Sequence, residues 1–295
     1  LAGAHQRAGD LKAAQTAIRK VIEIDPTNAT YPITLARLHW EAGENQKADQ
    51  VLEKALKADP DDPARRIAVA NFYLEKKKID RARQLLVEGL ASGDPGARLR
   101  LALSELYLKT NRTQEAVDLL EKGLKETRSS ETDERIRIQN ALAKIYLAAR
   151  EIETAKTYAE NVLKQEPANL QALVTHGMAL KSAGKADAAI RDFKQVLRRK
   201  PDFEQGYLQL ADAYAMQRKI GMARKTLDTG LRVAPANREL LMASYRVCLT
   251  QKDYKQAEQH LLDLVEKYPL AIDAQAMLGD FYLTLNDVSA ARREY

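Results

Sequence analysis

The sequence predicts an all-α fold, a right-handed superhelical solenoid of antiparallel helix pairs. Three series of residues predict it, because self-similarity at a period of about 20–50 residues is the signature of stacked repeats. Alanines recur every 34 residues, with one interval of 39, at Ala14, Ala48, Ala82, Ala116, Ala155, Ala189, Ala223, Ala257 and Ala291. Twelve residues before them stand Ala2, Ala36, Ala70, Ser104, Ala143, Gly177, Ala211, Tyr245 and Gly279, all small except Tyr245. Prolines recur at Pro26, Pro60, Pro167, Pro201, Pro235 and Pro269.

Each unit of this repeat is expected to form two amphipathic helices. In the unit 204–237, apolar side chains recur at helical spacing, first before the polar stretch 217–219 and again after it. The second helix should end before Pro235, because proline lacks an amide donor and clashes with the preceding turn. The other units repeat this pattern in order along the chain. Short polar residues beside the prolines, such as Asp59 and Asn237, are expected to cap the following helix.

The small residues are expected where two helices cross. Helices approach to about 8–10 Å only where the side chains at the crossing are short. Gly89, Gly123 and Gly230 share a further repeat position. A glycine inside a helix costs about 1 kcal/mol relative to alanine, so its recurrence there predicts unusually close packing.

The period, the small residues, an aromatic position and the terminal proline together resemble the tetratricopeptide repeat family. The stretch 208–214, followed by Ala223 and by Val233-Ala234-Pro235, matches the family pattern closely. The resemblance covers the chain in nine copies, of which the first and last are incomplete. The incomplete copies predict that the chain is a fragment of a longer array. Repeats one to four occupy 1–128, an extra-turn insertion occupies 129–135, and repeats five to nine occupy 136–295.

Two repeats depart from the pattern. The fourth carries Arg128 in place of its terminal proline, and the insertion after it should add a helical turn capped by Ser130 or Thr132. We expect a seam in the array there. The eighth carries Tyr245 where a small residue is expected and Cys248 in the aromatic position.

The composition excludes several classes of protein. Of 295 residues, 45% are apolar and 30% charged, but no apolar run approaches the roughly 18 residues that a membrane span needs. A single cysteine excludes an internal disulfide and leaves bacterial cytoplasm and periplasm equally open. The net charge is +6, yet the basic clusters 76–78 and 198–200 fall at predicted helix ends, where cations meet the helix dipole. We therefore expect protein partners and no nucleic acid, with the oligomeric state unknown.

The sequence predicts neither an enzyme nor a cofactor site. His5 and His39 occupy a repeat position that is otherwise filled by tyrosine, and no other ligand completes the four that zinc needs. Histidine in a tyrosine packing position is therefore the favoured interpretation. Cys248 falls on an apolar face without a base, so we interpret it as an inert thiol.

The family resemblance implies a concave face lined by the first helix of each repeat. We number each repeat so that Trp40 stands at position 12 of the second repeat. By helical geometry, positions 2, 5, 9, 12 and 13 of each repeat should then face this groove. Positions 5 and 12 are mostly apolar, so they either line the groove or pack against the neighbouring repeat. Trp40, at position 12, is the favoured contact, since tryptophan is enriched at binding hot spots. The candidate partner-binding residues are Arg37, Trp40, Asn71, Arg98, Glu105, Lys109, Arg137, Asn140, Lys144, Lys181, Asp212 and Arg246.

The charges on this face predict a direction for the partner. Repeats four to six are basic, and repeats seven to nine are acidic at Asp212, Glu239, Asp273 and Asp280. A basic centre would take an acidic peptide or a terminal carboxylate; ordinary surface variation is the alternative. The clamp with which some family members hold chaperone tails needs lysine at position 5 and asparagine at position 9. Here Asn71 is paired with Ile67, which argues against that clamp.

These observations favour a non-catalytic scaffold that binds peptide or helical segments of partner proteins in the groove. One alternative is a regulatory or substrate-recruiting array of an enzyme whose catalytic domain lies outside this chain. Another is a structural part of a bacterial envelope or secretion assembly.

Overall fold

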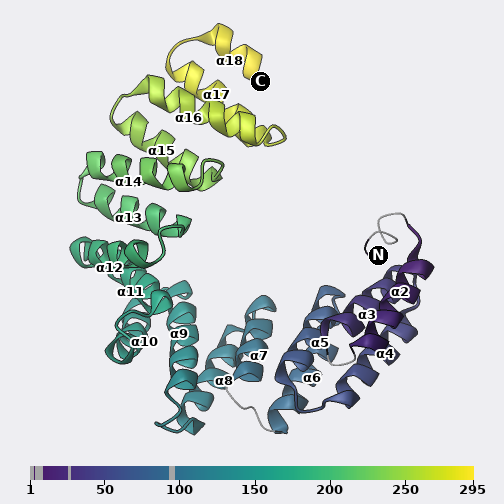
Figure 1. Ribbon diagram of the computed structural model, residues 1–295. Coiled ribbons are helices and arrows are strands. Elements are labelled where there is room, and N and C mark those ends of the chain that lie inside the picture. Colours follow the sequence, from purple (N-terminus) through teal and green to yellow (C-terminus); the bar gives the residue numbers. More distant parts are fainter. Residues whose placement is uncertain (1–2, 4–8, 26–27, 93–96) are drawn as a thin grey trace. The chain divides into compact units, whose positions relative to one another are not determined.

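A computed structural model describes residues 3, 9–25, 28–92 and 97–295, and in these ranges all regular structure is helical (Figure 1). Ala2, His5 and Pro26 lie outside them. The all-α solenoid of helix pairs is confirmed, with the predicted turn at 217–219. The helices are α2 (Leu11–Ile24), α3 (Thr30–Glu41), α4 (Asn45–Ala58), α5 (Pro63–Glu75), α6 (Ile79–Ala91), α7 (Arg98–Lys109), α8 (Thr113–Glu126), α9 (Thr132–Ala148), α10 (Ile152–Gln165), α11 (Leu170–Ser182), α12 (Ala186–Arg199), α13 (Glu204–Met216), α14 (Ile220–Val233), α15 (Arg238–Thr250), α16 (Tyr254–Lys267), α17 (Ile272–Thr284) and α18 (Val288–Glu294).

The helices form two compact units, Leu1–Ala141 and Leu142–Tyr295, and the division falls inside α9. Within each unit, a helix packs against the helices before and after it. First helices of successive repeats also touch directly: α3 contacts α5 and α5 contacts α7 in the first unit, while α11 contacts α13 and α13 contacts α15 in the second. Each unit therefore has a row of first helices along one side. The repeat boundaries at 128 and 136 stay a prediction.

Both series of small residues lie at helix crossings, as predicted. In the first series, the alanines from Ala14 to Ala257 are all 0% exposed. In the second, a Cβ atom added at Gly177 would lie 2.8 Å from the ring of Phe193. Such a contact is too short for carbon atoms, so glycine at position 177 makes room for this ring against the facing helix.

The glycines at the third repeat position leave room for a side chain of the first helix. A Cβ atom at Gly89 would lie 2.3 Å from Cδ of Arg66. The predicted close packing is therefore present, and a long or bulky side chain supplies it. The pairs are Gly89 with Arg66, Gly123 with Arg100, and Gly230 with Tyr207.

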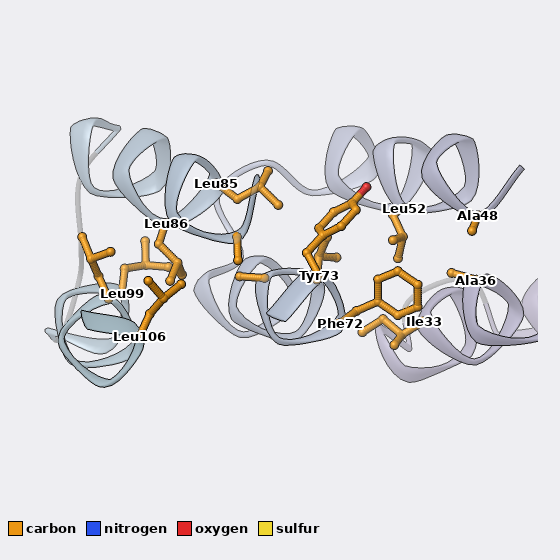
Figure 2. Close-up of a cluster of buried hydrophobic side chains, with 14 residues drawn as sticks. Ile33, Ala36, Ala48, Leu52, Phe72, Tyr73, Leu85, Leu86, Leu99 and Leu106 are labelled. Atoms are coloured by element: carbon orange, nitrogen blue, oxygen red, sulfur yellow. The ribbon is translucent and has the colours of Figure 1, made fainter. Parts of the chain in front are cut away.

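Figure 2 shows how the core of the first unit runs from one repeat into the next. Ile33 of α3 and Leu52 of α4 face Phe72 and Tyr73 of α5 in one cluster of buried side chains. The Tyr73 hydroxyl donates to Asp49 of the preceding repeat at 2.8 Å. Because each repeat completes the core of its neighbour, no helix pair is expected to be stable alone.

The turn inside each helix pair has a residue in the left-handed region. Its φ lies between 56° and 77° at Gly9, Gly43, Lys77, Asn111, Arg150, Gly184, Arg218, Lys252 and Asn286, which all share one repeat position. Two backbone hydrogen bonds close the turn; in the second repeat they run from Gly43 to the carbonyl of Trp40 and from Glu44 to that of His39. Glycine adopts this conformation without strain, whereas lysine and arginine do not.

Replacing Arg218 by glycine should therefore stabilise the chain by about 0.5–1 kcal/mol, because the left-handed conformation costs an L-residue about 1–2 kcal/mol and the added freedom of the unfolded chain offsets part of it. Urea unfolding measures the change. The matched control is Gly184→Ala at the same position one repeat earlier, which should destabilise. A loss of stability in Arg218→Gly would contradict the explanation.

Helix α9 is the longest described helix, and the assignment of its extra turn to the insertion 129–135 stays a prediction. Helix α9 begins at Thr132, spans 17 residues and carries Asp133 and Glu134 in its first turn. Arg135 donates through Nη1 to the carbonyls of Leu124 and Thr127, both at 2.9 Å. These bonds tie the start of α9 to the end of α8, where the terminal proline is missing.

Of the caps expected beside the prolines, Asn237 is confirmed and Asp59 is wrong. Asn237 caps α15, since its side chain accepts from the amide of Leu240 at 2.9 Å. Asp59, however, ends α4, and Asp62 caps α5 by accepting from the amide of Ala64 at 2.9 Å. The chain needs further turn residues after Pro60 before the next helix can begin, which moves the cap toward the C-terminus.

Candidate partner-binding surface

The predicted groove residues lie on first helices, and their exposure follows the repeat position. At position 5, Ile33 is 9% exposed and Asn140 is 4% exposed, so both side chains lie in the interior. Position 5 was expected either to line the groove or to pack against the neighbouring repeat. For Ile33 and Asn140 the burial supports packing. At position 9, Arg37, Asn71, Glu105, Lys144, Asp212 and Arg246 are exposed.

Three of the candidate charges, Arg37, Lys181 and Asp212, form ion pairs between neighbouring repeats. Arg37 donates through Nη2 to both carboxylate oxygens of Glu75, at 2.7 and 2.9 Å. Lys181 donates through Nζ to Asp212 at 3.1 Å. Lys181 of the predicted basic centre thus already holds Asp212 of the predicted acidic end.

Five candidate cations have no ion pair among the described residues: Arg98, Lys109, Arg137, Lys144 and Arg246. The first three lie in the first unit, together with Glu105, and the last two lie in the second. The residues of the predicted basic centre thus belong partly to each unit, and its existence as one site stays a prediction.

Trp40 fills a space between the second and third repeats. Its ring is half-buried and meets Phe72 edge-on, with ring centroids 5.7 Å apart. The ammonium of Lys76 lies 6.0 Å from the Trp40 ring and 5.7 Å from the Phe72 ring. Trp40 therefore supports the contact between repeats, and its exposed part borders a cation.

The second unit has an apolar pocket of about 710 Å³. The residues that α9 contributes stand at positions 9, 12 and 13, and those of α11 include positions 2, 5 and 9. These are groove positions that the sequence predicted. The lining is Lys144, Leu147 and Ala148 of α9, Leu170, Gln171, Val174, Thr175 and Met178 of α11, and Val196, Lys200 and Phe203 at and beyond the end of α12.

Two lysines border this pocket. Lys144 and Lys200 are both exposed, and neither forms an ion pair with any other described residue. The ammonium of Lys200 lies 5.6 Å from the ring of Phe203. Lys144 was a predicted contact, whereas Lys200 and Phe203, on the connection to the next repeat, were not among the candidates. The pocket combines an apolar lining with two cations at its border.

The histidine predicted to replace a packing tyrosine is confirmed in that role. His39 is 1% exposed, with Nδ1 2.6 Å from Glu44 and Nε2 3.4 Å from Arg19. Hydrogen bonds from Lys47 and then His39 lower the pKa of Glu44 to about 2. Cys248 is 1% exposed, and burial raises the pKa of its thiol, which suits the predicted inert role.

A second histidine joins three helices of the second unit. His176 of α11 lies between Asp192 of α12, at 2.7 Å from Nδ1, and Glu160 of α10, at 3.6 Å from Nε2. The hydrogen bond with Asp192 and the nearby charges raise the pKa of His176 above its usual value. The protonated form therefore favours the folded state. This stabilisation is complete below about pH 6.5, the pKa of an unperturbed histidine, and is lost as pH rises through the folded-state pKa.

Asp192→Asn should lower the pKa of His176 and weaken the dependence of stability on pH. Histidine proton NMR measures the pKa, and urea unfolding below and above neutral pH measures the stability. Asp187→Asn, on the same helix, is the matched control and should change neither. An unchanged His176 pKa in Asp192→Asn would contradict the assignment.

In the part of the chain that the structure describes, no group of three or more His, Cys, Asp or Glu side chains is arranged to hold a metal ion. No described helix is both long and apolar enough to cross a bilayer.

Comparisons with known proteins agree with the fold. A tetratricopeptide repeat model matches residues 6–72, 40–98, 73–145 and 180–244, and a second such model matches 246–295. No curated protein matches the sequence.

Solved structures share the fold at low identity. A chain of the APC/C hetero-tetramer Cut9–Hcn1 is 18% identical with a TM-score of 0.61; the match covers 92% of this chain and 52% of that one, so this chain spans about half its length. A tetratricopeptide repeat protein from Parabacteroides merdae is 16% identical with a TM-score of 0.58, covering 85% and 97%. A monomeric mutant of IFIT1 with Gppp-AAAA is 16% identical with a TM-score of 0.57, covering 100% and 78%.

At these identities the structural likeness concerns the fold alone, whereas the family models match most of the sequence. The recurring alanines, the helix pairs and the family models agree: this chain belongs to the tetratricopeptide repeat family, whose typical role is that of a protein-interaction scaffold.

Proposed function

We propose that the chain is a non-catalytic scaffold that binds an extended or helical segment of a partner protein along its first helices. The apolar pocket between α9, α11 and α12 carries the proposal. Its volume of about 710 Å³ and its lining of leucine, valine, methionine and phenylalanine suit a large apolar side chain of the partner.

The two lysines at the pocket lie where they can contact partner residues next to the apolar side chain. Lys144 and Lys200 lack a carboxylate partner among the described residues, so an acidic group of the partner gains a charge-assisted contact there. The preferred partner segment therefore has an apolar anchor followed by Asp, Glu or a terminal carboxylate.

The test selects short peptides from a display library against the intact chain and measures their affinity for variants by fluorescence anisotropy. Val174→Glu should weaken binding by about a hundredfold or more, because it places an unpaired carboxylate among apolar groups. Lys144→Glu combined with Lys200→Glu should weaken binding by about tenfold and reduce its dependence on salt. Met216→Glu adds the same charge at a 51% exposed site outside the pocket and should leave affinity unchanged.

Selected peptides that bind all four proteins equally would overturn the pocket as the binding site. Two alternatives follow from the sequence: a regulatory array of an enzyme, and a part of an envelope or secretion assembly. The other segments encoded by the same gene distinguish them. A catalytic domain in the same gene would favour the first, and a signal peptide or lipoprotein cysteine would favour the second.

A further inference from the structure

A basic groove lies on α12, away from the pocket. Arg191, Lys194 and Arg198 follow one another at i, i+3 and i+7, so they share one face of the helix. Together with Gln195, Leu197 and Leu210 of α13 they line a groove of about 520 Å³. The pocket residues Val196 and Lys200 lie on the opposite face of the same helix, since successive residues turn by about 100°. The groove and the pocket are therefore separate surfaces.

The three cations of this basic groove are not neutralised within the chain. No described carboxylate forms an ion pair with Arg191, Lys194 or Arg198, although Lys194 lies 5.7 Å from the ring of Tyr214. On α12 itself, Asp192 is engaged by His176 at 2.7 Å, and Asp187 stands in the first turn. Ordinary surface charges of this chain, such as Arg112 and Glu115, pair within one turn instead.

We propose that the basic groove binds an acidic amphipathic helix of a partner protein. Carboxylates at i, i+3 and i+7 of such a helix have the same spacing, about 10 Å from first to last, as the three cations on α12. The guanidinium groups of Arg191 and Arg198 can each hold a carboxylate through two parallel hydrogen bonds. Leu197, which is half-buried in the groove, offers a contact to a leucine between those carboxylates.

The lining favours a protein helix over nucleic acid. Sequence-tolerant binding of a nucleic-acid strand needs aromatic rings on which bases stack. Tyr214, whose ring lies beside Lys194, is 5% exposed and offers no such surface. Apolar side chains beside the cations instead match the apolar face of a helix.

The experiment uses the whole chain and a fluorescein-labelled helical peptide with glutamates at i, i+3 and i+7 and leucines between them. Charge reversal at Arg191, Lys194 and Arg198, all to glutamate, should weaken binding by about tenfold or more at about 0.15 M salt. The matched control reverses Lys225, Lys255 and Lys267 on α14 and α16, which changes the net charge by the same amount, and should bind as the unmodified chain does. Circular dichroism verifies that both variants are folded, and Arg191→Gln with Arg198→Gln replaces the triple variant if it is not.

Three outcomes would overturn the proposal: equal weakening in the control, equal binding of a peptide with serine in place of leucine, and tighter binding of a DNA duplex of the same charge. Val174→Glu distinguishes the two surfaces. It should weaken binding at the pocket by about a hundredfold or more and leave this peptide unaffected, so either proposal can fail while the other stands.

Discussion

Replacing Phe193 by alanine is expected to lower the free energy of unfolding by about 3–5 kcal/mol, as for other fully buried aromatic rings. Phe193 of α12 is 0% exposed and belongs to the cluster of buried residues that joins the sixth and seventh repeats. Its ring covers Gly177 of α11, so its removal leaves a void between the two helices of one pair. Urea unfolding followed by circular dichroism measures the loss, and hydrogen exchange of α11 and α12 locates it.

A double-mutant cycle with Gly177 tests the contact itself. In the unmodified chain, Gly177→Ala should destabilise, because the new Cβ would lie 2.8 Å from the Phe193 ring. This overlap outweighs the gain of about 1 kcal/mol from replacing glycine inside a helix. In the Phe193→Ala background the ring is absent, so the same substitution should stabilise. The sign of its effect reverses.

Gly221 of α14 provides the control, since no atom lies within 4 Å of a Cβ built there. Gly221→Ala should stabilise by a similar amount in both backgrounds. If Gly177→Ala stabilises the unmodified chain as much as Gly221→Ala does, the ring does not determine the identity of residue 177.

The helix pairs could be predicted because every repeat needs a small residue at the point where its two helices cross. The alanines from Ala14 to Ala257 are fully buried since each stands at a crossing that admits no larger side chain. Gly177 and Gly279 satisfy the same requirement under the rings of Phe193 and Tyr295. Tyr245 breaks the second series, and its ring lies edge-on to that of Phe281, with ring centroids 6.1 Å apart.

The left-handed turns could not be predicted from residue type. Positions such as Lys77, Arg150 and Lys252 carry side chains that give no sign of a positive φ. The backbone hydrogen bonds that close each turn impose the conformation, and exposed long side chains tolerate it. The regular spacing of Gly9, Gly43 and Gly184 was the available signal.

The candidate site was predicted in part. Helical geometry identified the positions of α9 and α11 that line the pocket, including Lys144 and Val174. Grouping charges by sign along the sequence failed for Lys181 and Asp212, which lie 31 residues apart and form an ion pair. Position within the repeat determines which charges lie close to one another. Lys200 was missed because the basic cluster 198–200 was interpreted as cations at a helix end.

Trp40→Ala is expected to destabilise the first unit by about 2–3 kcal/mol, because a half-buried ring that meets another edge-on loses both burial and aromatic contact. Urea unfolding measures the loss. Trp40→Phe keeps a ring against Phe72, whose centroid lies 5.7 Å away, and should cost less than about 1 kcal/mol. The pair of variants thus measures the packing role of this side chain.

The same pair separates packing from partner binding, since Trp40 is also the favoured contact among the candidate residues. If a partner segment uses the indole, Trp40→Phe should weaken binding by about tenfold, as at other tryptophan hot spots, while the chain stays folded. Leu52→Ala, at a fully buried site in the cluster against which Trp40 packs, is the control for a residue that only packs, and should reduce stability without changing affinity. Unchanged affinity in Trp40→Phe would make packing the whole role of Trp40. The ring would then be retained for its contact with Phe72 and Lys76, and partner binding would belong to the second unit.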